Sequence, residues 1–308
     1  MLEKNIKRLE SLLQNAASLT LLRLQSDSPM TEQRFYAVET LNNRETYPES
    51  MVKSPIYQHY VDFQAMSYLK PMNDTKSREH GLKIASVLPE YRKILLRSSV
   101  PEKNYSPDFD ALERKAIRSG IPVLRLFMGF PDGQMYSYPA MTKFPEKYDV
   151  TDRFWFKNGM NNKNGHPVWS HPYLDIWPEN GPVLTCYMPL KHEKNQGVIA
   201  LDLSLKNMEL DNHFQKDTPP YLLERTLLDA DGKVLISTDP LNRPDFKGDQ
   251  PEDTLKIKEY SNSNIVKQML SMKIGLIRVQ EDRVNTAYIF HQMQSLDWIY
   301  MEKIDLDK

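Results

Sequence analysis

The chain has 308 residues, with 40 lysines and arginines against 41 aspartates and glutamates. A nucleic-acid-binding protein normally carries a basic excess, so this balance argues against a nucleic-acid partner. The only cysteine, Cys186, excludes a disulfide framework and disfavours a cysteine-ligated metal. No stretch has the roughly eighteen consecutive apolar residues that a membrane span needs.

The chain opens with a predicted amphipathic helix that runs to about Leu24. Apolar residues recur there at helical spacing: Leu2, Ile6, Leu9, Leu13 and Ala16. This stripe either packs on the protein's own core or forms the seam of a homodimer. The segment is too charged and too periodic for a signal peptide. Pro29 follows a serine that could cap a helix, which predicts a second helix or a kink.

Further helices are expected before the pattern changes to strands. We predict helices over 54–70, 76–97 (broken near Pro89) and about 109–119. The alternation in 121–139 around Asp132–Gly133 then predicts a β-hairpin, because this turn needs a positive φ. Two more strands are predicted over 183–190 and 197–205.

The second half repeats this plan after a linker-like segment at 214–221. Strands flank Asp231–Gly232, which follows the first Asp-Gly turn by 99 residues and hints at a duplicated unit. One helix over 264–272 and three strands complete this half. Each half is therefore helix followed by antiparallel sheet, an α+β pattern.

The segment 148–177 concentrates aromatic rings, one arginine and several aspartates between the two predicted hairpins. We predict a loop-rich cover on the sheet, and long structured loops of this kind are usually functional. His166 and His171 near Asp175 could ligate zinc, but no zinc motif supports them. Asp175 and Asp202 could form an acid–base pair as in a glycosidase. No nucleophile motif or phosphate loop accompanies them, and a binding site fits these residues at least as well.

A small zwitterion would match this chemistry. An arginine offers a planar fork of donors to a carboxylate, and an indole N–H adds another. Two aspartates with tyrosine hydroxyls can surround an ammonium, and ring faces add cation–π attraction. The alternative is a structural ion pair beneath an aromatic loop, and chemistry alone leaves both open. The candidate residues are Tyr148, Arg153, Trp155, Phe156, Tyr173, Asp175 and Asp202.

The order of motifs resembles the double Cache sensor domains of bacterial chemoreceptors, histidine kinases and cyclic-di-nucleotide enzymes. The motifs are "FMGFPDGQMYSYP", "YDVTDRFWF", "PYLD" and "GVIALDLSL" in the first half, and "TLLDADGKVLIST" and "DWIYMEKIDL" in the second. The resemblance implies a long N-terminal helix region (1–45) and two PAS-like antiparallel-sheet subdomains in tandem. These are a membrane-distal, ligand-binding one (46–212) and a membrane-proximal one (213–308).

All seven positions in the pattern of the amino-acid-binding subgroup of this family can be placed on this sequence. By that resemblance, Tyr148, Arg153 and Trp155 hold the ligand carboxylate, and Tyr173, Asp175 and Asp202 hold the ammonium. Family members often have a tyrosine at the position of Phe156, so this chain lacks one hydroxyl there.

The resemblance also implies a setting for the chain. It would be the periplasmic part of a bacterial inner-membrane receptor, binding an α-amino acid without cofactor, metal or catalysis of its own. Any kinase or cyclase output would lie elsewhere in the full-length protein. The alternatives are a sensor for a biogenic amine or another small cation, and a structural module with no ligand.

Overall fold

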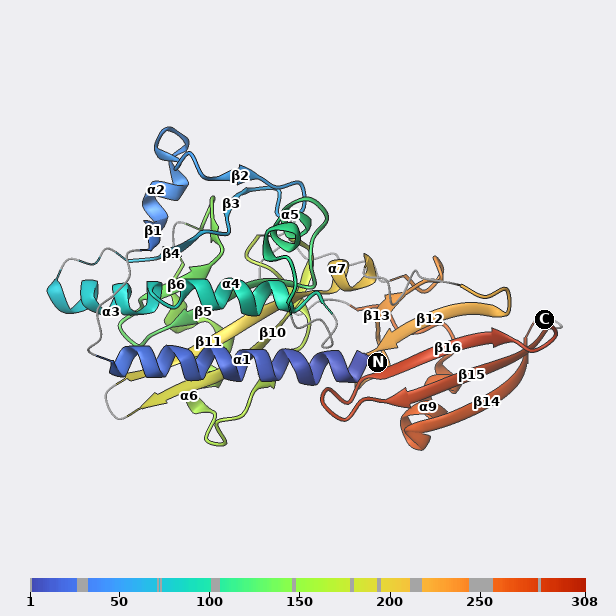
Figure 1. Ribbon diagram of the computed structural model, residues 1–308. Helices are drawn as coiled ribbons and strands as arrows, with labels where there is room; N and C mark the ends of the chain where they lie inside the picture. Colours follow the sequence, from blue (N-terminus) through green and yellow to red (C-terminus); the bar gives the residue numbers. More distant parts are fainter. Residues whose placement is uncertain are drawn as a thin grey trace. The chain divides into compact units, whose positions relative to one another are not determined.

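The computed structural model describes residues 2–26, 33–70, 72, 74–100, 106–145, 148–177, 180–192, 195–210, 218–243, 257–281 and 284–308. Its backbone contacts define two compact units. One comprises Arg8–Ser204, and the other comprises Met1–Lys7 with Leu205–Lys308. The predicted boundary at 212/213 lies outside the described residues. The predicted α+β class, with a long N-terminal helix and antiparallel sheets, is confirmed (Figure 1).

Helix α1 spans Leu2–Gln25, as the apolar periodicity predicts. Leu9, Leu13 and Ala16 of the predicted stripe are buried within the chain itself. The Thr20 hydroxyl lies 2.5 Å from the hydroxyl of Tyr91 on α4. The stripe therefore packs on the protein's own core, the first of the two alternatives.

The first unit is built on an eight-stranded sheet of order β1-β4-β6-β5-β11-β10-β8, with β9 also paired to β10. Its central pairs are antiparallel, whereas β1 and β4 are parallel. The strands are β1 (Arg34–Ala37), β4 (Ala65–Tyr68), β5 (Val123–Gly129), β6 (Met135–Tyr138), β8 (Val168–Trp169), β9 (Tyr173–Leu174), β10 (Pro182–His192) and β11 (Asn195–Ser204). A small sheet joins β2 (Val52–Lys53), β3 (Tyr60–Asp62) and β7 (Ala140–Met141).

The remaining helices of this unit flank the sheet or connect its strands. They are α2 (Val38–Asn42), η1 (Arg44–Thr46), α3 (Thr75–Ala85), α4 (Leu88–Arg97), α5 (Phe109–Ser119), η2 (Val150–Asp152) and α6 (Phe154–Asn161). Aspartate side chains cap α3 and α5: Asp108 accepts hydrogen bonds from the amides of Asp110 and Ala111. The break between α3 and α4 falls just before Pro89, as predicted.

Strand register fixes which side chains share a face of the sheet. Leu126 and Met128 of β5 lie opposite Leu201 and Ile199 of β11, whereas Arg125 and Phe127 alternate with them and face the other way. Helix α3 lies on the Met128 side, because Tyr136, opposite Met128, meets the ring of His80. Helix α6 lies on the Arg125 side, where a Cβ at Gly159 would come within 2.5 Å of Val198.

The second unit carries a five-stranded antiparallel sheet of order β13-β12-β16-β15-β14. Its elements are α7 (Leu205–Leu210), β12 (Leu222–Leu228), β13 (Val234–Ser237), α9 (Ser263–Met272), β14 (Ile274–Glu281), β15 (Val284–Gln292) and β16 (Ile299–Asp305). Helix α9 packs Ile265 and Met269 into a core with Leu228 and Ile299.

The two predicted Asp-Gly turns both form. Gly133 (φ 80°) joins β5 to β6, and Gly232 (φ 82°) lies between β12 and β13. Both values lie in the region where a residue with a Cβ is strained.

The predicted helix over 54–70 is wrong, because this segment forms β3, a turn and β4. In the turn, the Asp62 carboxylate accepts a hydrogen bond from the backbone amide of Gln64 at 2.8 Å. Val61, Phe63, Ala65 and Met66 are all buried, so apolar residues fill both faces and the alternation that marks a strand is lost. The prediction of a second helix or kink around Pro29 lies outside the described residues.

Candidate functional site

A polar row crosses three strands in the middle of the first unit's sheet. Thr185 on β10 is paired with Asp202 on β11, and Asp202 is paired with Arg125 on β5. All three side chains are buried and point to the α6 face. The register shifts immediately after Asp202, and such bulges often occur beside functional sites.

Two aspartates share the guanidinium of Arg125. Its Nη2 contacts Oδ1 of Asp175 and Oδ2 of Asp202. Asp175 comes from the segment that follows β9, and it is fully buried like Asp202. Both carboxylates are buried and paired with Arg125 in this structure, which offsets the cost of removing their charges from water.

The other carboxylate oxygens are held by neutral donors. Asn180 donates to Oδ2 of Asp175 at 2.7 Å, and Thr185 donates to Oδ1 of Asp202 at 2.6 Å. The Thr185 hydroxyl in turn lies 2.6 Å from the hydroxyl of Tyr173. Three of the predicted ligand residues, Tyr173, Asp175 and Asp202, therefore belong to one buried network.

Aromatic rings enclose the Arg125 end of this network. The guanidinium carbon lies 4.5 Å from the ring centroid of Trp177 and 5.3 Å from that of Phe127. The Trp177 indole donates to the carbonyl of Lys143 at 2.9 Å, which fixes the ring in place. Ring faces at these distances favour a cation.

Arg153 and Tyr148 form the other half of the predicted site. Arg153 immediately precedes α6, and its guanidinium carbon lies 4.9 Å from the Tyr148 ring centroid. The Tyr148 ring lies 5.0 Å from Phe144, which lies 5.3 Å from Trp177. An unbroken path of rings thus links Arg153 to the Arg125 network.

Trp155 and Phe156 place α6 against the same face of the sheet. The Trp155 ring packs edge-on against Phe127, with centroids 4.9 Å apart. Gly129 makes room for both α6 rings, since a Cβ there would lie 3.0 Å from Trp155 and 3.1 Å from Phe156. All seven predicted residues are therefore brought to one face of one sheet.

The electrostatics of the cluster are set by two carboxylates against one guanidinium. Burial raises the pKa of Asp202 to about 6; Arg125 opposes this rise and Asp175 adds to it. Burial lowers the pKa of Arg125, but the two carboxylates outweigh it and keep that pKa above its ordinary value. Arg125 is therefore a permanent cation, whereas Asp202 is the group whose raised pKa allows it to take up a proton.

Sequence reasoning missed Arg125. The partners of Arg125 are distant in the chain, but one feature of the sequence could have indicated its role. Arg125 is the only charged residue in the otherwise apolar strand "VLRLFMG". A cation in the middle of a buried strand requires a buried anion, and Asp175 in the aromatic segment and Asp202 after it were candidates.

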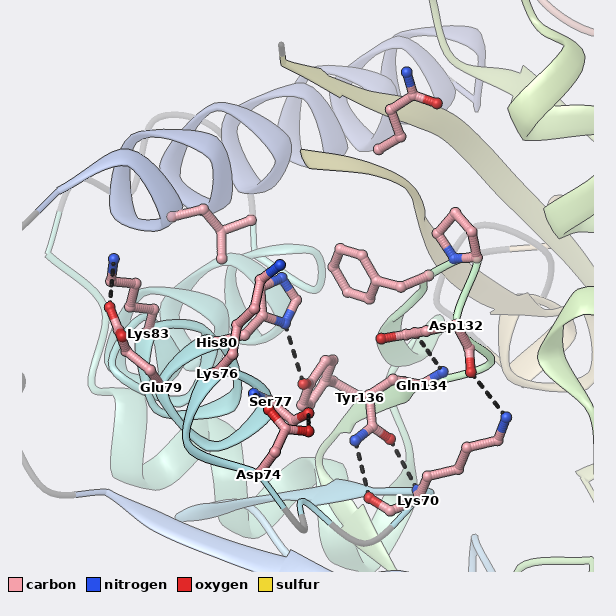
Figure 2. Close-up of a pocket in the computed structure, with 14 residues that line it drawn as sticks. Lys70, Asp74, Lys76, Ser77, Glu79, His80, Lys83, Asp132, Gln134 and Tyr136 are labelled. Atoms are coloured by element: carbon pink, nitrogen blue, oxygen red, sulfur yellow. Dashed lines mark hydrogen bonds and ion pairs between the residues drawn. The ribbon is translucent and has the colours of Figure 1, made fainter. Parts of the chain in front are cut away.

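A cleft of about 900 Å³ lies on the opposite face, between α3 and the β5–β6 turn (Figure 2). Its lining carries three lysines and three acidic residues, and none of the seven predicted residues. The polar groups pair with one another: Lys83 with Glu79 at 3.0 Å, and Lys70 with the Asp132 carbonyl at 2.9 Å. Three basic and three acidic side chains cancel in formal charge, so this cleft does not select a ligand charge.

The residues that the structure describes contain no cluster of three His, Cys, Asp or Glu side chains placed to hold a metal. His171 is exposed, whereas Asp175 is buried and bound to Arg125. Within the described ranges, no helix is long and apolar enough to cross a membrane. Cys186 is buried on β10, and burial raises the pKa of its thiol well above the ordinary value.

Residues 129–210 match the family model described as the methyl-accepting chemotaxis protein-like, first PDC sensor domain. The matched range contains all seven predicted ligand residues, and Arg125 lies just before it. The predicted resemblance to bacterial receptor sensor domains is confirmed for this segment. No curated protein sequence matches the chain.

The comparison with solved structures finds several ligand-binding domains at low identity. The domain of Mlp24 with asparagine is 15% identical, with a TM-score of 0.43 over 71% of this chain and 77% of that one. The domain of the Pseudomonas fluorescens chemoreceptor CtaA with L-leucine is 20% identical, with a TM-score of 0.43 over 64% and 74%. The domain of the Pseudomonas aeruginosa PAO1 receptor PctB with L-Gln is 22% identical, with a TM-score of 0.42 over 67% and 77%.

Proposed function

We propose that this chain is the ligand-sensing part of a bacterial signalling receptor and that it recognises a small α-amino acid. The observation that carries the proposal is the convergence of Asp175 and Asp202 on one cation inside an aromatic enclosure. Such a subsite accepts a positive group that is stripped of water, because two carboxylates and ring faces replace the lost hydration.

Arg153 supplies the complementary half. It lies at the start of α6, joined to the acid pair through Tyr148, Phe144 and Trp177. A guanidinium at one end and an acid pair at the other fit the carboxylate and ammonium of one zwitterion. Tyr148, Trp155 and Phe156 would line the carboxylate side, and Tyr173 would order the acid pair through Thr185.

The family match supports a role in signalling for the segment that contains this site. We therefore place the chain in the periplasm, as part of a protein anchored in the inner membrane. An output domain outside this chain would carry any kinase, cyclase or chemotaxis activity. The first unit would bind the ligand, and the second unit would connect it toward the membrane.

A thermal-shift panel on the purified 308-residue chain tests the proposal. It would contain the twenty common amino acids, amines such as putrescine, and carboxylates that lack the amine. A ligand that binds only the native state raises the melting temperature. We expect at least one amino acid to do so. Amines active in the absence of any active amino acid would overturn the zwitterion assignment, and silence across the panel would leave a structural module.

A further inference from the structure

Arg125 lies where the resemblance places the ligand's ammonium group, between Asp175 and Asp202. We propose that Arg125 is an internal competitor for this subsite, so that binding an amino acid exchanges the guanidinium for the ligand's ammonium. The inference rests on the proposed function and adds a residue that sets the affinity and selectivity of the site.

The geometry of the oxygens makes the two cations mutually exclusive. Each aspartate gives one oxygen to Arg125 and the other to a neutral donor, Asn180 or Thr185. The two oxygens that face each other across the subsite are the ones that Arg125 occupies. An ammonium bridging the acid pair would need these same two oxygens, and two like charges repel each other strongly at so buried a position.

Arg125 is held in place by charge more than by fitted hydrogen bonds. Its Nε and Nη1 are buried, and neither has a hydrogen-bond partner among the described residues. A guanidinium can donate five hydrogen bonds, and buried donors left without acceptors oppose the gain from the ion pairs. The occupied state is thus stable against an empty acid pair but open to displacement by a better-fitted cation.

Two consequences follow for ligand binding. In the ligand-free site Arg125 keeps both buried carboxylates paired, and leaving them unpaired would be strongly destabilising. The apparent affinity for an amino acid also depends on how often Arg125 leaves the subsite. The smaller the fraction of molecules in which Arg125 has left, the weaker the apparent binding. A carboxylate without an amine cannot displace Arg125, so the exchange favours ligands that bring their own cation.

The direction of the effect of Arg125→Gln tests the inference. The amino acid that gives the largest thermal shift would be titrated calorimetrically into the unaltered chain and the variant. Removal of the competitor should lower Kd at least about tenfold. If Arg125 only supported the fold, its loss would weaken binding, so the sign separates the two roles.

Arg92→Gln is the matched control. Arg92 also bridges two carboxylates in the first unit, Asp110 and Glu113, each at 2.7 Å. Its loss removes a doubly paired arginine outside the site and should leave Kd unchanged.

A crystal structure of the unaltered chain with the same amino acid gives a second test that needs no variant. We expect the ammonium between Asp175 and Asp202, with the Arg125 guanidinium withdrawn. Equal or weaker binding by folded Arg125→Gln, or Arg125 still between the aspartates in the liganded protein, overturns the inference alone. If no amino acid binds to either the unaltered chain or the variant, the proposed function is overturned with it.

Discussion

Asp202 and Arg125 are paired residues on neighbouring strands, and the carboxylate of one meets the guanidinium of the other in the middle of the sheet. Both side chains are almost completely buried. Sheet registers seldom place a buried ion pair at the centre of an apolar face, because desolvation opposes it. A third group, Asp175, gives the cluster more negative than positive charge, which is what a site for a cationic group requires.

Arg153→Ala should weaken amino-acid binding strongly. The substitution leaves the ligand carboxylate desolvated without its main partner, and truncating one member of a buried charge pair typically costs about 2–5 kcal/mol. This corresponds to roughly a 30-fold to several-thousand-fold rise in Kd. Calorimetric titration of the cooperatively melting variant measures it. His171→Ala, an exposed change in the same segment, is the control and should bind like the parent. If Arg153→Ala bound the amino acid with the affinity of the unaltered chain, Arg153 would not belong to the site.

Asp202→Ala should also weaken binding, by a comparable factor, because half of the ammonium subsite is lost. Arg125 would keep Asp175 as its partner, so the variant should still fold. Titration with an amino acid and with the corresponding carboxylate lacking the amine separates the two ends of the ligand. The amino acid should lose affinity, and the carboxylate should not. Equal losses for both ligands would mean that Asp202 acts on the fold and not on the ammonium.

The turns could be predicted from sequence because their signals are local, and the seven candidate residues were singled out in the same way, from a motif within one segment and one strand. Asp132–Gly133 and Asp231–Gly232 each need positive φ, and two to four residues suffice to reveal that. The aromatic segment was expected to be loop-rich, although part of it is the short helix α6, where Gly159 allows close approach to β11. The helix predicted over 54–70 failed because burial on both faces of β3 and β4 hides the strand period.

Arg125 could not be assigned from local pattern, since its role depends on tertiary pairing. Asp175 is 50 residues away in the chain, and Asp202 becomes its neighbour only through the β5–β11 register. Spacing along the chain carries no information about such a register. The sequence motif therefore predicted the acid pair but not the cation already bound to it.

The stability of the ligand-free protein should depend on pH through Asp202. Its folded pKa of about 6 lies above the ordinary value of 3.8 because of burial. The folded state then binds the proton more tightly than the unfolded state, so this contribution is complete below about pH 4 and is lost as pH rises through about 6. Urea unfolding at pH 4, 5, 6 and 7 should show the unaltered chain losing stability relative to Asp202→Asn up to about pH 6, with a constant difference above. A relative gain over that range would mean that Arg125 dominates and that the folded pKa is lowered.

Gly159→Ala should loosen α6 from the sheet and weaken ligand binding. The new Cβ would lie 2.5 Å from one methyl of Val198 and 2.7 Å from the other, so the helix must shift. Overpacking of this kind costs about 1–3 kcal/mol, against a gain in helix propensity of about 1 kcal/mol. The melting temperature should fall, and Kd should rise because α6 carries Trp155. Asn161→Ala changes an exposed residue on the same helix, so it should neither lower the melting temperature nor raise Kd. Unchanged Kd in a destabilised Gly159→Ala would show that α6 does not position the site.

Tyr260→Phe tests whether the second unit is independent of ligand binding. Glu224 is buried there and is held by neutral donors alone among the described residues, including Tyr260 at 2.8 Å. Loss of a hydrogen bond that leaves a buried acceptor unsatisfied costs about 1–3 kcal/mol, so the variant should unfold at lower urea concentration. Its amino-acid affinity should match the parent, because we place the ligand in the first unit. Tyr221→Phe, an exposed hydroxyl in the same unit, should change neither stability nor affinity. If Tyr260→Phe is destabilised and also binds several-fold more weakly, while Tyr221→Phe does not, then the second unit contributes to the site and the assignment to the first unit alone is wrong.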